Sequence, residues 1–207
     1  MKNLLASSLL SLLAFGCGVG EGEGEVQSER LYIENCWNGH FDLGPDFFAA
    51  NPEQKETLLI RVQRGDNIEE MSDGLSVLVT DLQTLRGQLE QPIRVGLPPE
   101  VKPPGIPVVF DPDPPKVSLH LYLHRACQAQ NATVHALDGT IVFHSLFSGD
   151  PNESNAEARL TDADFTGTFG DPRLADPLLD PDPMVMSTVT GHFRFYFHRG
   201  QPAQPFQ

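Results

Sequence analysis

Two segments of this chain carry imidazole and phenol side chains at every second position. They are His120, Tyr122 and His124 in one segment, and His192, Arg194, Tyr196 and His198 in the other. Imidazole nitrogens bind zinc and copper. Two side chains four residues apart on one strand are about 13 Å apart, however, which is too far to share a metal ion. His120, His124, His192 and His198 are therefore weak metal candidates that need the two strands to pair. The alternative is a solvated polar face of a sheet.

Aspartates concentrate in the second half of the chain. They are Asp162, Asp164, Asp171, Asp176, Asp180 and Asp182, with Asp111 and Asp113 earlier. Oxygen-rich loops suit calcium, but residues 161–165 lack the ligand spacing of an EF-hand loop. Several of these aspartates precede proline, which is ordinary turn chemistry. Calcium binding and solvated loops both remain open.

Catalytic templates are absent from the sequence. It contains no GxSxG, HExxH or phosphate-binding loop. The net charge is −14, and lysines and arginines do not cluster, which disfavours binding to nucleic acid. We therefore expect a protein that is not an enzyme, holds no cofactor and does not bind nucleic acid.

The N-terminus has the pattern of an export signal. Lys2 precedes an apolar run over residues 4–15 that is too short to span a bilayer. Residues 13–17, Leu-Ala-Phe-Gly-Cys, resemble the lipobox of bacterial lipoproteins. That resemblance covers about the first 18 residues. It implies that the signal peptide is cut before Cys17, whose thiol takes a diacylglycerol and whose new amino group is acylated, for example with palmitate. An ordinary secretory signal, the alternative, predicts the same cut after Gly16.

The same resemblance implies a location in the cell. Gly18 follows Cys17, where enteric bacteria place aspartate to retain a lipoprotein at the inner membrane. We therefore expect a lipid anchor in the bacterial outer membrane, with the protein facing the periplasm or the cell surface. The expected partners are the membrane, through the N-terminal lipid, and a protein of the envelope.

The chain has three cysteines. If Cys17 carries lipid, Cys36 and Cys127 remain as an even pair in an oxidising compartment, where disulfides persist. A zinc site is the alternative, but no CxxC pair is present. A disulfide between Cys36 and Cys127 would close a long loop and stabilise the folded protein by about 4–5 kcal/mol in the chain-entropy model.

The sequence suggests four parts: the signal peptide 1–16, a lipidated Cys and Gly/Glu-rich tether over 17–29, one domain over 30–200, and a tail over 201–207. Residues 18–29 read GVGEGEGEVQSE, a composition typical of a disordered spacer that reaches at most about 40 Å. Residues 97–116 are rich in proline, which predicts a stiff extended loop. We interpret it as an excursion within one domain, with a linker between two small domains as the alternative.

Alternating apolar residues predict short strands in several segments: residues 57–63, 75–80, 92–95, 117–127, 158–161, 165–169 and 187–198. Asp138-Gly139, between residues 131–137 and 140–147, is a strong signal for a hairpin. Residues 46–56 are typical of a turn or a short helix beginning at Pro52. The prediction is an all-β protein, an antiparallel β-sandwich of about eight short strands with Pro-rich loops.

Two functions are consistent with these patterns. The first is a membrane-anchored envelope lipoprotein with a non-catalytic binding or structural role. The alternative is a metal- or carbohydrate-binding module, with or without enzymatic activity, that uses the His/Tyr strand faces or the Asp-rich loops.

Overall fold

A computed structural model describes most of the chain. The described residues are 22–54, 56–65, 72–98, 113–127, 133–174 and 183–198. The signal peptide, Cys17, most of the Pro-rich segment and the tail 201–207 lie outside them. The described strands are β1 (Gly22–Ile33), β2 (Trp37–Leu43), β3 (Phe47–Gln54), β4 (Thr57–Arg64), β5 (Asp73–Val79), β6 (Pro92–Val95), β7 (Val117–Leu123), β8 (Thr133–Ser145), β9 (Leu160–Gly170) and β10 (Ser187–Tyr196). One α-helix, α1 (Leu82–Arg86), and two 3₁₀ turns, η1 (Glu157–Arg159) and η2 (Pro183–Val185), complete the described elements.

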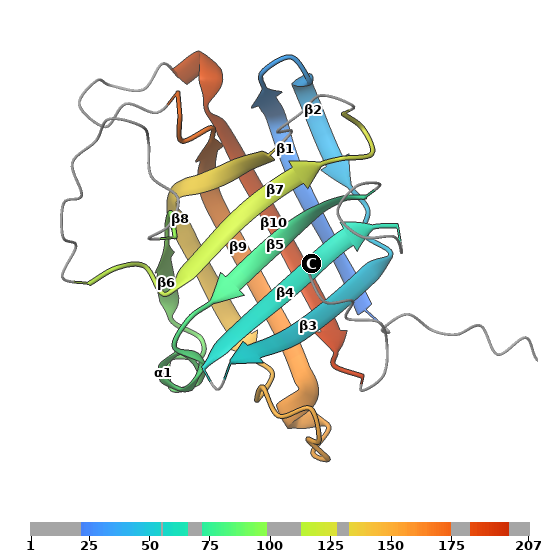
Figure 1. Ribbon diagram of the computed structural model, residues 1–207, viewed down its shortest axis with the longest axis vertical. Helices are drawn as coiled ribbons and strands as arrows, with labels where there is room; N and C mark the ends of the chain where they lie inside the picture. Colours follow the sequence, from blue (N-terminus) through green and yellow to red (C-terminus); the bar gives the residue numbers. More distant parts are fainter. Residues whose placement is uncertain are drawn as a thin grey trace, which may run out of the picture.

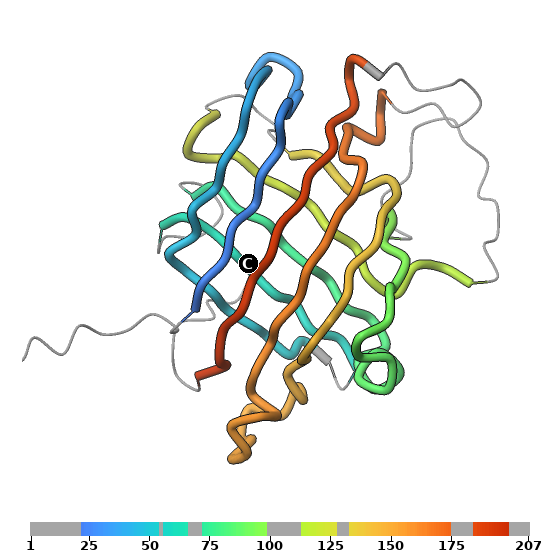
Figure 2. The backbone as a smooth tube through the Cα atoms, turned by 180° about the vertical axis from the view of Figure 1, so that it is seen from behind, coloured from blue at the N-terminus to red at the C-terminus, as the bar shows by residue number. Residues whose placement is uncertain are grey.

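The ten described strands form one hydrogen-bonded sheet in the order β2-β1-β10-β9-β8-β6-β7-β5-β4-β3. Figure 1 shows how the sheet curls into a half-barrel, in which β7, β5, β4 and β3 cross in front of β9, β10, β1 and β2. Figure 2 shows the second layer from behind. The prediction of an all-β protein is confirmed. A sandwich of about eight strands is not, because the strands belong to one continuous sheet.

The inner faces of the two layers enclose the hydrophobic core. Strict alternation places Leu58, Ile60 and Val62 of β4 in the core, as predicted from period two. From the other layer, Phe193 and Phe195 of β10 pack into the same core. The fully buried aromatic side chains are Phe143, Phe147, Phe169, Phe193 and Phe195. Burial of such rings is the main favourable term that holds the layers together.

Strand β8 turns the sheet from one layer into the other. Its first residues pair with β7, with His135 opposite His120, and its later residues pair with β6, with Val142 opposite Pro92. The change of partner falls at Asp138-Gly139, and the register with β9 shifts just before it, between Ala136 and Asp138. The predicted hairpin at this dipeptide is therefore wrong. The irregularity between Ala136 and Asp138 lies within one continuous strand, which it bends as bulges do.

Strand β1 begins inside the segment predicted to be a disordered tether. Residues 22–29 belong to β1, so the predicted tether over 17–29 is wrong for its larger part, and the folded domain begins before residue 30. The glycines are needed for space: a Cβ on Gly22 would meet Phe48 and Phe195 at 2.7 Å, and one on Gly24 would meet the His192 carbonyl oxygen at 2.7 Å. The Gly-Glu alternation is a strand pattern with small residues where aromatic rings approach.

Three other segments differ from prediction. Residues 47–54 form β3 at one end of the described strand order and not a turn or helix, and Pro52 is tolerated there because an edge strand needs fewer ladder donors. The two short strands predicted over 158–161 and 165–169 are one strand, β9. Strand β6 has the predicted bounds, but it lies between β8 and β7 and is parallel to β7.

Gly139→Ala is expected to destabilise the protein by about 2–4 kcal/mol through overpacking and backbone strain. Gly139 has a φ of 147°, and an added Cβ would contact the Thr166 carbonyl oxygen and lie 2.5 Å from the Gly167 Cα atom. Urea unfolding measures the loss. Gly44→Ala is the matched control, because its added Cβ meets nothing within 4 Å. Equal midpoints for the two variants would contradict the role assigned to Gly139.

Candidate functional site

A disulfide joins the two layers at one end of the domain. Cys36 lies in the turn between β1 and β2, Cys127 follows β7, and their Cα atoms are 5.5 Å apart. The predicted disulfide is confirmed. Because the two cysteines are 91 positions apart in the sequence, the cross-link lowers the entropy of the unfolded chain by an amount worth about 4–5 kcal/mol.

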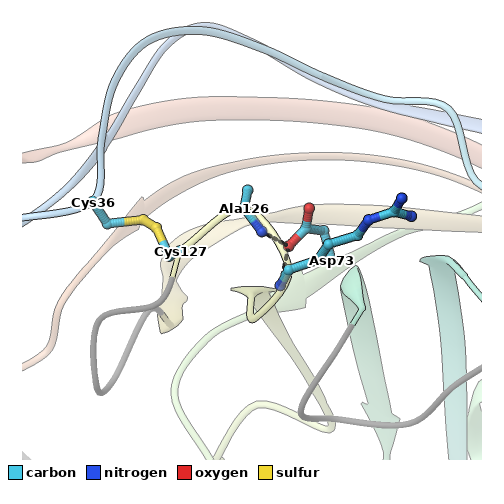
Figure 3. The surroundings of a disulfide bond; sticks show 5 residues. Cys36, Asp73, Ala126 and Cys127 are labelled. Atoms are coloured by element: carbon cyan, nitrogen blue, oxygen red, sulfur yellow. Dashed lines mark hydrogen bonds between the residues drawn. A yellow bond between two sulfur atoms is a disulfide. The ribbon is translucent and has the colours of Figure 1, made fainter.

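The position of Cys127 is set by a carboxylate at the start of β5. In Figure 3, Asp73 reaches the turn that precedes Cys127, and its Oδ1 accepts hydrogen bonds of 2.9 Å from the backbone N–H groups of Arg125 and Ala126. The Cys127 N–H donates to the Leu123 carbonyl at 2.9 Å. Asp73 thus holds the backbone of this turn from another strand, directly before the half-cystine that is bonded to Cys36.

Trp37 follows Cys36 in the chain and packs against the core at this end of the domain. Its ring meets Phe41 edge-on at 5.8 Å, and its Nε1 donates to the His40 carbonyl at 3.2 Å. Both Trp37 and Cys36 are partly buried against the core. The contacts assign the tryptophan a packing role at this end of the domain.

A polar pocket of about 240 Å³ lies next to the disulfide, between the β1–β2 turn, the start of β8 and the end of β9. Its polar lining includes Tyr32, Glu34, Asn35, Thr133, Asp171 and Arg173. The Arg173 Nε lies 2.9 Å and 3.0 Å from the two carboxylate oxygens of Asp171. Burial raises the pKa of Asp171, but the Arg173 hydrogen bonds outweigh it and leave this pKa below its usual value.

Sequence reasoning did not find this pocket. Its residues come from four separate segments, and only Asp171 was noticed, as one of many aspartates before proline. The one local signal is Asn35, whose left-handed φ of 58° fits the turn that asparagine favours. The pocket offers an aromatic ring, carboxylates, an amide and a guanidinium, which can donate and accept many hydrogen bonds. Such a lining suits a small ligand rich in hydroxyl groups.

The His/Tyr stripe of β7 is more buried than predicted. The centroids of the His120 and His135 rings are 5.7 Å apart, and the Tyr122 hydroxyl donates to Gln63 Oε1 at 2.7 Å. Tyr122 is only 5% exposed and Gln63 1%. Burial, and then the charges of His135, Arg61 and His124, lower the pKa of His120 to about 4. His120 is therefore neutral near pH 7.

The stripe of β10 lies in the other layer and carries ion pairs. The His192 Nε2 is 3.3 Å from Asp162, and the Arg194 Nε is 3.5 Å from the same carboxylate. On β8, which β9 separates from β10, His144 lies between Asp164 and Glu90, with each ring nitrogen 2.8 Å from a carboxylate oxygen. Hydrogen bonds that the His144 ring donates to Asp164 and Glu90 raise the pKa of His144.

The four histidine candidates for a metal do not come together. His120 and His124 lie on or next to β7, His192 lies on β10, and β8 and β9 separate these strands in the sheet; His198 is exposed beyond the end of β10. Within the described ranges, no three His, Cys, Asp or Glu side chains are arranged to hold a metal ion. Asp162 and Asp164 lie on strand β9 and not in a loop, whereas residues 111, 176, 180 and 182 lie outside the described residues.

Comparison with known proteins adds no relative. No protein-family model, no curated protein and no solved structure matches this chain. In the part of the chain that the structure describes, none of the helices has the length and apolar character needed to cross a membrane.

We expect His120→Gln and His144→Gln to change the pH dependence of stability in opposite directions. The folded pKa of His120 is lowered from 6.5 to about 4, so its contribution is present above pH 6.5 and is lost as the pH falls toward 4, by about 3 kcal/mol at most. The folded pKa of His144 is raised, so its contribution is present below pH 6.5 and is lost as the pH rises through the folded pKa. Solvent screening limits it to about 1 kcal/mol.

Urea unfolding of the wild type and both variants, from about pH 4 to above pH 6.5, measures the free energy of unfolding at each pH. The stability difference between wild type and His120→Gln should shrink on acidification, whereas that for His144→Gln should shrink as the pH rises. Curves that run parallel to the wild type for both variants would contradict the prediction. Each variant controls for the other, since both replace an imidazole with an amide.

Proposed function

We propose that this chain is a lipoprotein of the bacterial cell envelope, anchored in the outer membrane through acylated Cys17, with a non-catalytic binding or structural role. The observation that carries the proposal is the disulfide. Because Cys36 and Cys127 are bonded to each other, neither can form a disulfide with Cys17. This pairing is consistent with acylation of Cys17, the third cysteine. A disulfide also fits an exported protein, since oxidising compartments preserve it.

A role in binding is supported by the polar pocket beside the disulfide. Its lining is built from the β1–β2 turn and the two strands β8 and β9, which the sheet and the disulfide hold in place. Pre-formed concave sites with a few polar groups are typical of binding sites. The net charge of −14 favours a protein or a neutral ligand over nucleic acid.

Mass spectrometry of protein extracted from membranes tests the anchor. The wild type is expected to begin at Cys17 and to carry diacylglycerol and acyl mass, whereas Cys17→Ser should lack this mass and leave the membrane fraction. The double variant Cys36→Ser/Cys127→Ser is the control, which should lose the disulfide but keep the lipid. A wild-type chain without acyl mass would overturn the proposal.

A carbohydrate-binding module is the second candidate, favoured by the chemistry of the same pocket. Sugars present hydroxyl groups to carboxylates and amides, and an apolar face to rings such as Tyr32. Glu34, Asn35 and Asp171 line the pocket with Tyr32. This candidate does not require a metal ion.

A glycan array probed with the Cys17→Ser chain tests the second candidate. Glu34→Gln should weaken binding of a retained glycan by about tenfold, the value of one hydrogen bond to a charged group. Glu25→Gln is the matched control, because Glu25 is exposed on β1 away from the pocket. If the array shows no binding, or if both variants lose affinity equally, carbohydrate recognition by this pocket is excluded.

A further inference from the structure

The folded domain begins very close to the proposed anchor. Strand β1 starts at Gly22, only five residues after Cys17. Five steps of an extended chain reach at most about 18 Å. Gly22 is fixed in the sheet, because it lies opposite Phe195 and the following residues of β1 pair with β10 and β2. If Cys17 carries lipid, as the proposed function requires, the end of the domain at Gly22 is held near the bilayer.

An open groove lies at this end of the domain. It has a volume of about 370 Å³ and is lined by Gly22, Glu23, Arg194, Phe195 and Tyr196. Strand β10 ends at this groove, and Figure 1 shows its arrowhead beside the start of β1. Arginine forms hydrogen bonds with phosphate, and tyrosine is favoured at the level of lipid head groups. Arg194 and Tyr196 are thus the two lining residues that suit a membrane surface, and Glu23 is the one carboxylate among the five.

The disulfide and the polar pocket lie at the opposite end. Strand β1 runs from Gly22 to Ile33, a distance of about 36 Å at 3.3 Å per residue. Ile33 lines the polar pocket, and Cys36 follows in the next turn. A domain that stands on its Gly22 end thus presents the pocket away from the membrane.

A domain lying flat on the sheet face of β1, β10 and β9 is disfavoured by charge. The carboxylates on or beside this face are Glu23, Glu25, Glu90, Asp162 and Asp164. They outnumber its cations Arg30 and Arg194 and the two histidines, His144 and His192, taken together. An anionic lipid surface repels such a face, whereas the groove end brings Arg194 and Tyr196 toward the head groups.

We infer that the groove at the start of β1 rests on the membrane that carries the anchor, with Arg194 and Tyr196 against phospholipid head groups. The polar pocket beside the disulfide then faces away from the bilayer. This inference rests on the proposed acylation of Cys17. It adds a defined orientation and a lipid contact surface to the anchor.

The native tryptophan provides the test. Trp37 is the only tryptophan, and it lies at the disulfide end. Acylated wild-type protein and the acylated variant Trp37→Phe/Tyr196→Trp would be placed in vesicles of phosphatidylethanolamine and phosphatidylglycerol that contain lipid with a nitroxide on its head group. The nitroxide should quench the fluorescence of the variant and leave that of the wild type unchanged. Mass spectrometry of the same samples reports the lipid on Cys17.

Two further variants in the Tyr196→Trp background test the contact by Arg194. Arg194→Gln and the control Thr188→Glu each lower the net charge by one, but residue 188 lies on β10 toward its other end. Only Arg194→Gln should weaken the quenching. Equal effects of the two variants would overturn the contact.

The outcomes separate the inference from the proposed function. An unacylated chain would overturn the proposed function, and the orientation with it. An acylated chain in which both tryptophans are quenched equally, or in which neither is quenched, would overturn the orientation alone. Thermal melting of each variant confirms that the compared proteins are folded.

Discussion

The close approach of β8 and β9 at Gly139 is the constraint on which the curled sheet depends. At this point the backbone of Gly139 lies against Thr166 and Gly167, and β8 exchanges its pairing with β7 for pairing with β6. A side chain there would separate the strands. Without the bend, the two layers could not face each other, and their apolar inner faces would have no common core.

Local sequence signals predicted strands well but failed where distant residues decide the conformation. Alternation in residues 57–63 and 187–198 gave the correct inner faces, because period two does not depend on the partner strand. The glycines at 22 and 24 looked like a flexible spacer, yet Gly22 makes room for the Phe48 ring and Gly24 for the backbone of His192. Asp138-Gly139 looked like a turn, yet β9 pairs on both sides of it and keeps the strand continuous.

For the candidate sites, too, local patterns predicted some features, and others depend on residues far apart in the sequence. Pairing of the two remaining cysteines followed from counting, and the structure confirms it. The outward positions of His192 and Arg194 followed from alternation. The strand that neighbours β7 could not be predicted in this way, because a short alternating segment carries no information on its partner. His120 lies opposite His135 of β8, and not opposite a residue of β10. The pocket combines residues near 34, 133 and 172, which no local pattern links.

The two ends of the domain are restrained by different physical means. At the end where β1 begins, hydrogen bonds to β10 fix the chain, and Phe147 stacks on Phe197 at 4.1 Å. At the other end, the β1–β2 turn and the end of β7 belong to different layers and are not neighbours in the sheet. The disulfide supplies the connection that the sheet lacks there. Since Asn35 lines the pocket directly before Cys36, the bond that restrains this end also holds one wall of the pocket, and an oxidising compartment preserves both.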